Sequence, residues 1–176
     1  AMQVMWDGWV TPEKSHTYIV GHWNYNVGTV KPVYVISNGT NVDLFLNGKK
    51  IATGINSYRY LFTFDKIAYE PGKLEAVSYD ANMKELSRYS VETVGRPDHL
   101  KLTTIQNPLG FKADGADMAL VQVEVVDSVG RRCPLDNRMI HWNQYGEGEW
   151  IGGIATSTKD GNYIHQTNLP IECGVG

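Results

Sequence analysis

The sequence predicts an all-β fold with two β-sandwich domains in tandem, the second of them incomplete. Short segments rich in valine, threonine and tyrosine recur between turn residues, and the 176 residues include 18 glycines and 10 tyrosines. This composition favours strands joined by tight turns, and no stretch carries apolar residues at helical spacing over three turns. With 42% apolar residues, the chain can build ordinary cores without a metal ion or another cofactor.

The first domain, residues 1–95, contains segments for seven strands at the short spacing that is typical of a sandwich. They are "TYIV" from Thr17, "KPVYVIS" from Lys31, "NVDLFLNGKKIA" from Asn41, "YRYLFTFD" from Tyr58, "KLEAVSYD" from Lys73 and "ELSRYSVETV" from Glu85, with the Asn41 segment counted as two strands.

A tight hairpin is predicted inside the third of these segments. Asn47 and Gly48 favour a type I′ turn, because both central residues of that turn need a positive φ. Side chains alternate between the two faces of a strand. Val42, Leu44 and Leu46 therefore share the buried face.

The segment "GRPDH", residues 95–99, marks the domain boundary. Pro97 cannot continue a central strand, and a new set of strand-like segments begins directly after it. The second domain then comprises residues 96–176.

The second domain has fewer strand segments than the first. "LKLTTIQ" comes first, Val121, Val123 and Val125 then alternate with polar residues, and "RMIHWNQ", "GEWIGGIA" and "GNYIHQ" follow. Five or six strands are few for a closed sandwich. We expect an open edge near Ile171, which either pairs with a second copy of the chain or is covered by the chain's own tail.

Charge and hydropathy exclude two classes of partner. The 16 basic and 19 acidic residues give a net charge of −3 and are scattered along the chain, so no basic face is available to bind nucleic acid. No apolar run approaches the roughly 20 residues that span a bilayer.

The N-terminus "AMQVMWDGWV" lacks the basic start and apolar core of a signal peptide. Trp6 and Trp9 lie close to this end and need a neighbour to cover them. The chain is therefore either cytosolic or a piece of a longer precursor, and we expect the second.

The cysteines and histidines do not form a metal-binding pattern. Cys133 and Cys173 are too far apart for a C-x-x-C motif; they are either two free thiols or a candidate disulfide, which would imply an oxidising compartment. The five histidines show no ligand spacing. We expect no metal site.

Two aromatic groups are candidate contact sites. His22, Trp23 and Tyr25 stand together in "VGHWNYNVGTV"; with Trp6 and Trp9 they could dock against another domain or stack on a sugar. A second group consists of Trp142 and Trp150, which flank "NQYGEGE" and either contact carbohydrate or pack on the core.

Longer tracts carry a family resemblance. "GHWNY" followed by "KPVYVISNGTNVDLFLNGKKI", "YLFTFDKIAYEPGKLEAVSYD" and "RYSVETVGRPDHLKLT" resembles the C-terminal β-sandwich region of family 2 glycoside hydrolases, in particular bacterial β-galactosidase-like enzymes. "GFKADGADMALVQVEVVDSVGRRCP" with "GEGEWIGGIA" resembles the second immunoglobulin-like module that follows there. The resemblance implies that both domains are immunoglobulin-like sandwiches.

The resemblance also implies that catalysis takes place elsewhere. In such enzymes a (β/α)₈ barrel N-terminal to these modules carries the two catalytic glutamates, and no residue of this chain matches either of them. Retaining glycosidases hold two carboxyl groups about 5 to 5.5 Å apart. Here the acidic residues fall in turns or at alternating strand positions, as solvated carboxylates do: Asp65, Asp80, Asp114, Asp117, Asp127, Asp136, Glu75 and Glu124.

We therefore expect a non-catalytic accessory region of a β-galactosidase-like enzyme that packs against a catalytic domain outside this chain. The resemblance places the parent enzyme in the periplasm or outside the cell. One alternative is a carbohydrate-binding module that uses Trp6, Trp9, Trp23, Tyr25 or Trp142 to hold an oligo- or polysaccharide. Another is an adhesion or spacer module.

Overall fold

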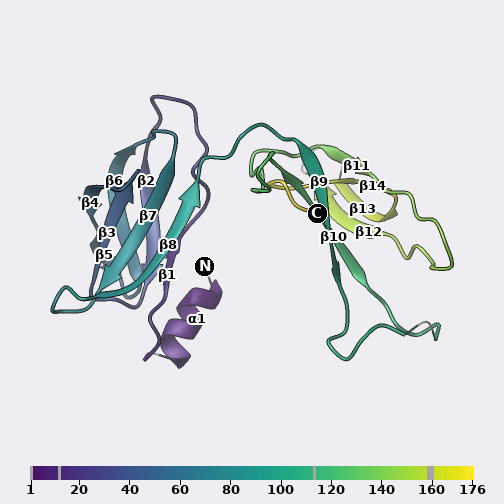
Figure 1. Ribbon diagram of the computed structural model, residues 1–176, viewed down its shortest axis with the longest axis horizontal. Coiled ribbons are helices and arrows are strands. Elements are labelled where there is room, and N and C mark those ends of the chain that lie inside the picture. Colours follow the sequence, from purple (N-terminus) through teal and green to yellow (C-terminus); the bar gives the residue numbers. More distant parts are fainter. Residues whose placement is uncertain (1, 12, 113, 158–160) are drawn as a thin grey trace. The chain divides into compact units, whose positions relative to one another are not determined.

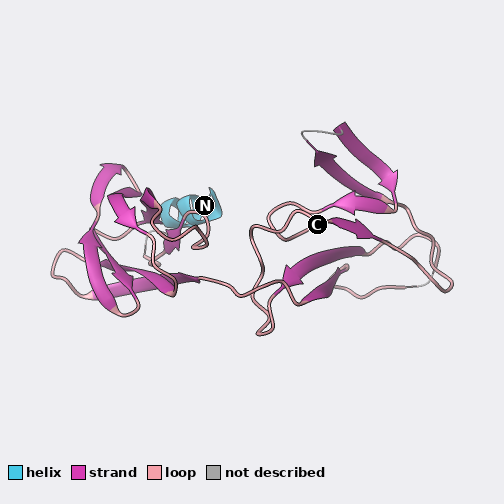
Figure 2. Ribbon diagram, turned by 90° about the horizontal axis from the view of Figure 1, so that it is seen from above, coloured by secondary structure: helices cyan, strands magenta, loops and turns pink. Residues whose placement is uncertain are grey.

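The computed structural model describes residues 2–11, 13–112, 114–157 and 161–176. In these ranges the chain consists of antiparallel strands and one short helix (Figure 1; helix in cyan in Figure 2). The all-β prediction is confirmed. The chain divides into two compact units, Ala1–Thr93 and Val94–Gly176. Among the described residues, no helix has the length and apolar character needed to cross a membrane.

The first unit is a β-sandwich of two four-stranded antiparallel sheets. The strand orders are β1-β2-β6-β5 in one sheet and β4-β3-β7-β8 in the other. The elements are α1 (Met2–Val10), β1 (Thr17–Ile19), β2 (Val30–Ser37), β3 (Asn41–Leu46), β4 (Lys49–Thr53), β5 (Ile55–Tyr58), β6 (Leu61–Ala68), β7 (Lys73–Tyr79) and β8 (Glu85–Glu92).

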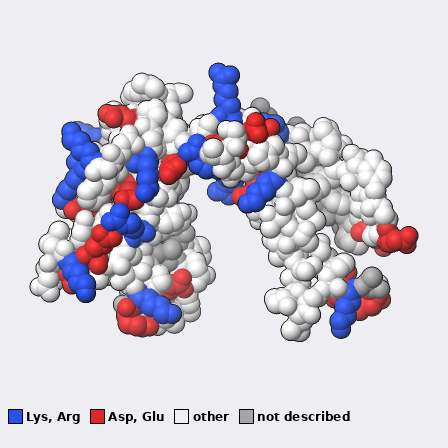
Figure 3. Space-filling view, viewed as in Figure 1, with Lys and Arg blue, Asp and Glu red and all other residues white. Residues whose placement is uncertain are grey.

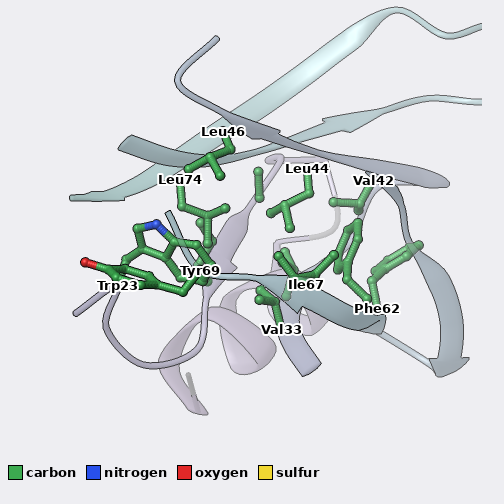
Figure 4. Packing of buried hydrophobic residues seen from close by; sticks show 13 residues of the cluster. Trp23, Val33, Val42, Leu44, Leu46, Phe62, Ile67, Tyr69 and Leu74 are labelled. Atoms are coloured by element: carbon green, nitrogen blue, oxygen red, sulfur yellow. The ribbon is translucent and has the colours of Figure 1, made fainter. Parts of the chain in front are cut away.

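The core of this unit fills the space between its two sheets (Figure 4). Val42, Leu44 and Leu46 of β3 are all buried, as their alternation predicts. Facing side chains include Phe62 on β6, and Leu74 comes from β7, beside β3. Burying side chains of this size contributes roughly 1.5–3 kcal/mol each before the cost of ordering them.

The predicted hairpin between β3 and β4 is present. Asn47 has φ 51° and Gly48 has φ 81°, the positive values that a type I′ turn needs. The Asn47 side chain also bonds to another segment. Its amide N–H donates to the carbonyl of Pro71 at 3.1 Å, and its Oδ1 accepts a hydrogen bond from the N–H of Lys73 at 2.9 Å. The turn therefore also holds the segment that leads into β7.

Two elements of the first unit were not predicted. Helix α1 occupies Met2–Val10, and it ends where the N–H and Oγ1 of Thr11 both donate to the carbonyl of Asp7. Strand β5 has four residues, all of them exposed. Because neither face of β5 is buried, it carries no alternation that a sequence pattern could reveal.

The second unit consists of three two-stranded sheets in the described residues: β9 with β10, β11 with β14, and β12 with β13. Its strands are β9 (His99–Ile105), β10 (Leu120–Val126), β11 (Met139–His141), β12 (Gly153–Ser157), β13 (Gly161–Gln166) and β14 (Asn168–Pro170). Its core is small: Val123, Val125, Cys133, Ile140 and Ile171, with Val94 and Trp142 packed against them.

The C-terminal tail covers one side of β10. Val123 exchanges two main-chain hydrogen bonds with Gly176, at 2.8 and 3.0 Å, and the N–H of Val125 donates to the carbonyl of Gly174 at 2.9 Å. Ile171 is buried, and its N–H donates to the carbonyl of Arg138. Of the two ways of covering the edge that the sequence left open, the structure has the chain's own tail, which bonds to β10.

Asp127 organises the start of the second unit. The sequence suggested a solvated carboxylate, but the side chain is almost fully buried. Its Oδ2 accepts the N–H of Gly95 at 2.9 Å, and its Oδ1 accepts the N–H groups of Val129 and Arg131 at 3.1 and 2.9 Å. The Arg131 guanidinium adds a contact at 2.9 Å. This carboxylate ties the segment that enters the unit to the turn after β10.

The two cysteines are free thiols, Cys133 buried and Cys173 exposed. The candidate disulfide is therefore not formed in this structure. Burial, together with Asp127 and Asp136, raises the pKa of the Cys133 thiol, which disfavours the reactive thiolate.

Candidate functional site

Trp23 belongs to the core of the first unit. It is 1% exposed, its indole N–H donates to the carbonyl of Glu70 at 2.9 Å, and its own carbonyl accepts the Thr93 hydroxyl at 2.9 Å. The ring meets Tyr69 edge-on at 5.2 Å between centroids (Figure 4). Trp23 is thus unable to stack on a sugar or dock against another domain, and its assignment as a contact residue is corrected.

His22 and Tyr25 are half-buried and form a cluster with Lys31. The rings of His22 and Tyr25 stack at 4.7 Å between centroids with an interplanar angle of 26°. Lys31 Nζ lies 2.5 Å from Tyr25 Oη and 4.2 Å from the centre of that ring. We call these three residues the His22 cluster.

The electrostatics of the His22 cluster favour a neutral imidazole. Partial burial, and then the positive charge of Lys31, lower the pKa of His22. Its Nδ1 accepts the N–H of Asn24 at 3.1 Å, so the proton of the neutral ring is on Nε2. The cluster thus offers one cation, one imidazole N–H and the edges of two rings.

A small hollow lies beside the cluster, lined in part by Val20, His22, Lys31, Pro32 and Tyr34. Its volume is about 30 Å³, which is room for one or two water molecules and too little to enclose a sugar ring. A ligand of that size would rest on this surface. Lys31 was not recognised in the sequence, because it lies at the start of a strand and only the turn before β2 brings it back over Tyr25.

Trp6 and Trp9 form an exposed pair on α1. They are 56% and 67% exposed, and their rings meet edge-on at 5.4 Å between centroids. Residues three apart on a helix are neighbours on its surface. This pair keeps the exposure that a docking contact requires.

Trp142 and Trp150 lie together in the second unit, with ring centroids 5.7 Å apart and planes tilted by 31°. Both are half-buried, and Trp142 packs against the core. The indole N–H of Trp150 is buried and has no hydrogen-bond partner among the described residues. The core-packing reading fits Trp142 better than a sugar platform, for which two open ring faces would be needed.

The acidic residues do not resemble a glycosidase site. Glu75 and Glu85 both bind Arg88, at 2.9 and 2.7 Å, and on the face shown in Figure 3 acidic and basic side chains are interspersed. Hydrogen bonds lower the pKa values of Glu85, Asp127 and Asp136, whereas a general acid needs a raised one. Among the described residues no group of three or more potential ligands is placed to hold a metal ion.

Comparison with known proteins shows which proteins the chain is similar to. Residues 28–87 match a family described as "Domain of unknown function (DUF4982)", a domain associated with the C-terminal part of family 2 glycoside hydrolases. A β-glucuronidase of Formosa agariphila is 41% identical over 99% of this chain, which corresponds to 17% of that protein. The chain is homologous to part of a family 2 glycoside hydrolase. A β-galactosidase of Bacteroides ovatus is 27% identical over 81% of this chain and 16% of its own length.

Solved structures agree with this family assignment. A β-glucuronidase from glycoside hydrolase family 2 superposes with a TM-score of 0.85 at 40% identity, over 93% of this chain and 17% of the other. A family 2 member from Bacteroides cellulosilyticus has a TM-score of 0.79 at 24% identity and shares the fold. The chain thus spans less than a fifth of the curated relatives described here.

Proposed function

We propose that this chain is a non-catalytic accessory region of a family 2 β-glycosidase that packs against a catalytic domain outside residues 1–176. One observation carries the proposal: the chain aligns over 99% of its length with a β-glucuronidase, but over 17% of that enzyme. A segment of this kind can be essential for the stability of an enzyme without touching its substrate.

The chemistry of the described residues supports a non-catalytic role. Glycoside hydrolysis needs one carboxylic acid that stays protonated and a second carboxylate across the scissile bond. Glu85, Asp127 and Asp136 have lowered pKa values, and the largest cause of each shift is a hydrogen bond. They serve ion pairs and turns in the fold.

The parent enzyme, on this proposal, hydrolyses β-glucuronides or β-galactosides, the activities named for its relatives. Its substrates are pieces of polysaccharide, so we place it in the periplasm or outside the cell. The Trp6–Trp9 pair is the proposed docking contact, because two large apolar side chains on one helix face gain most by leaving water.

Two assays test this proposal. The purified chain should not hydrolyse aryl β-glucuronides or aryl β-galactosides; turnover that is lost when an acidic residue of this chain is mutated would contradict it. In the parent enzyme, a Trp6→Ser/Trp9→Ser double variant should lower the melting temperature, whereas Tyr145→Ser, at a residue that is 90% exposed, should not. An equal effect of both variants would remove the docking role.

Binding of a glycan is the second candidate function, and the His22 cluster favours it. Lys31 presents a cation beside the imidazole of His22 and the ring of Tyr25, a combination suited to a sugar that carries a carboxylate. Titration calorimetry with glucuronic acid oligomers should show binding that Lys31→Met weakens and Lys49→Met, at an exposed lysine of β4, does not. Equal affinity for neutral and acidic oligomers would contradict it.

A further inference from the structure

Strand β9 is an edge strand that no described residue of its unit covers on its outer side. All seven residues, His99–Ile105, are exposed, and β9 pairs with β10 alone. Along most of its length the ribbon of β9 and β10 is uncharged on the face shown in Figure 3. An exposed edge of this length can accept another strand.

The direction of the main-chain groups of β9 follows from the bonds that β10 makes with the tail. Val123 gives both its N–H and its C=O to Gly176, and the N–H of Val125 points to Gly174. In an antiparallel ladder, the N–H and C=O of one residue point to the same side, and successive residues alternate. The residues of β10 that bond to β9 are therefore Gln122, Glu124 and Val126.

The register then shows which groups of β9 remain free. Val123 lies opposite Leu102 and Val125 opposite Leu100, so both are non-hydrogen-bonded pairs. Leu100, Leu102 and, by the same alternation, Thr104 point their N–H and C=O groups away from β10. Among the described residues, none of these groups has a hydrogen bond to another part of the chain.

The side chains at this edge are apolar on the face that continues the core. Leu100 and Leu102 are 46% and 60% exposed, whereas Val125 and Val123, beside them on the same face, are 1% exposed. The apolar face of the sheet therefore extends from the buried side chains of β10 to exposed side chains on β9. An added strand would satisfy the free main-chain groups and shield this row.

We propose that β9 pairs antiparallel with β9 of a second copy of this chain, around a two-fold axis at Leu102. The two Leu102 residues then exchange main-chain hydrogen bonds, and each Leu100 does so with the partner's Thr104. The result is a continuous sheet in the order β10, β9, β9, β10, with the leucine rows adjacent. This proposal does not depend on the proposed accessory function.

The self-complementary register is what favours a second copy over another occupant. Centring the axis on Lys101 would set two lysines directly opposite, which is destabilising. Centring it on Thr103 would leave Leu100 without a partner. Only the register at Leu102 uses all three free residues and places Lys101 opposite the uncharged Thr103, while Lys101 keeps Glu124 of its own sheet at 3.5 Å.

Analytical ultracentrifugation of the 176-residue chain tests the pairing. The chain should change from monomer to dimer as its concentration rises through the micromolar range. Leu102→Lys puts two charges across the axis and should weaken the dimer by about tenfold or more. The matched control is Leu120→Lys, at an equally exposed apolar residue (63%) on the opposite face of β10, which should leave the dimer intact. Circular dichroism checks that each variant is folded.

Mixing two variants of opposite charge is the most decisive test of the pairing. Leu102→Lys and Leu102→Glu should each be monomeric, and an equal mixture should dimerise again, because opposite charges now meet at the axis. A mixture that stays monomeric, or a Leu120→Lys variant that loses the dimer as well, overturns the proposal. So does a wild-type chain that is monomeric throughout with fast amide exchange at Leu102; β9 would then be covered by a different domain.

Discussion

Trp23 joins three distant parts of the first unit through one side chain and one carbonyl. Its indole N–H reaches the carbonyl of Glu70 across 47 residues of sequence, and its carbonyl reaches the hydroxyl of Thr93 across 70. Thr93 Oγ1 also accepts the N–H of Gly72 at 3.1 Å. The residue therefore fixes the chain before β2 to the ends of the opposite sheet.

Replacing Trp23 should unfold the first unit much more easily. We expect Trp23→Ala to lower the free energy of unfolding by about 3–5 kcal/mol, because the lost ring leaves a cavity and an unpaired carbonyl at Glu70. Trp6→Ala, which removes an exposed ring, should cost no more than about 0.5 kcal/mol. Urea denaturation of the isolated chain measures both. Similar costs for the two variants would show that the burial of Trp23 has little energetic weight.

At the scale of elements, the turn between β3 and β4 does two things at once. Its backbone conformation reverses the chain, and its Asn47 side chain bonds to Pro71 and Lys73. Gly72 has φ 138°, and a Cβ at this glycine would lie 1.9 Å from Asn47 Oδ1. The turn and the segment before β7 thus fit together only because residue 72 has no side chain.

Two substitutions at Asn47 separate these roles. Asn47→Gly keeps the positive φ and removes the side-chain bonds, so it should cost about 1 kcal/mol. Asn47→Ala loses the same bonds and also strains the backbone, so it should cost about 1–2 kcal/mol more than glycine. Thermal or urea unfolding of the first unit gives the comparison. If Asn47→Gly were as stable as the wild type, the bonds to Pro71 and Lys73 would be unimportant.

The strands were predictable where one face is buried, because apolar and polar residues then alternate along the strand. Val42, Leu44 and Leu46 show this clearly, and the Asn47-Gly48 turn followed from its φ requirement. Burial of Trp23 was not predictable, because the groups that enclose it come from 47 and 70 residues away. The exposure of Leu102 was not predictable either. Its strand alternates in the same way as a strand with one buried face, and the sequence does not show whether other residues cover that face.

At the scale of the whole molecule, the two units have different sources of stability. The first has a large apolar core between two sheets. Among the described residues, the second unit has one small core cluster of five buried residues. It relies more on polar contacts, above all those of Asp127, which accepts hydrogen bonds from the N–H groups of Gly95, Val129 and Arg131. Each unit should therefore respond differently to a change that acts on charges alone.

Acid should destabilise the second unit through Asp127. The N–H of Gly95, and then Arg131 and Val129, hold the pKa of this carboxyl well below its ordinary value of 3.8. Because the folded state has the lower pKa, the carboxylate stabilises the fold fully above the unfolded value, and this contribution is lost as the pH falls through and below about 4. Asp136, whose pKa Arg138 lowers, acts in the same direction.

Urea unfolding of the second unit can be followed by the fluorescence of Trp142 and Trp150. The remaining tryptophans are replaced by phenylalanine where the fold tolerates it. The urea concentration at the unfolding midpoint should fall between pH 5 and pH 3 when Asp127 is present. Asp127→Asn should start from a lower midpoint at pH 7 and show a flatter pH dependence, because the amide cannot titrate and is a poorer acceptor for three N–H groups. Asp114→Asn, at an exposed loop carboxylate, is the control and should keep the wild-type slope. If Asp127→Asn kept the full slope too, the acid sensitivity would arise from other carboxyl groups and the buried carboxylate would not control the stability of this unit.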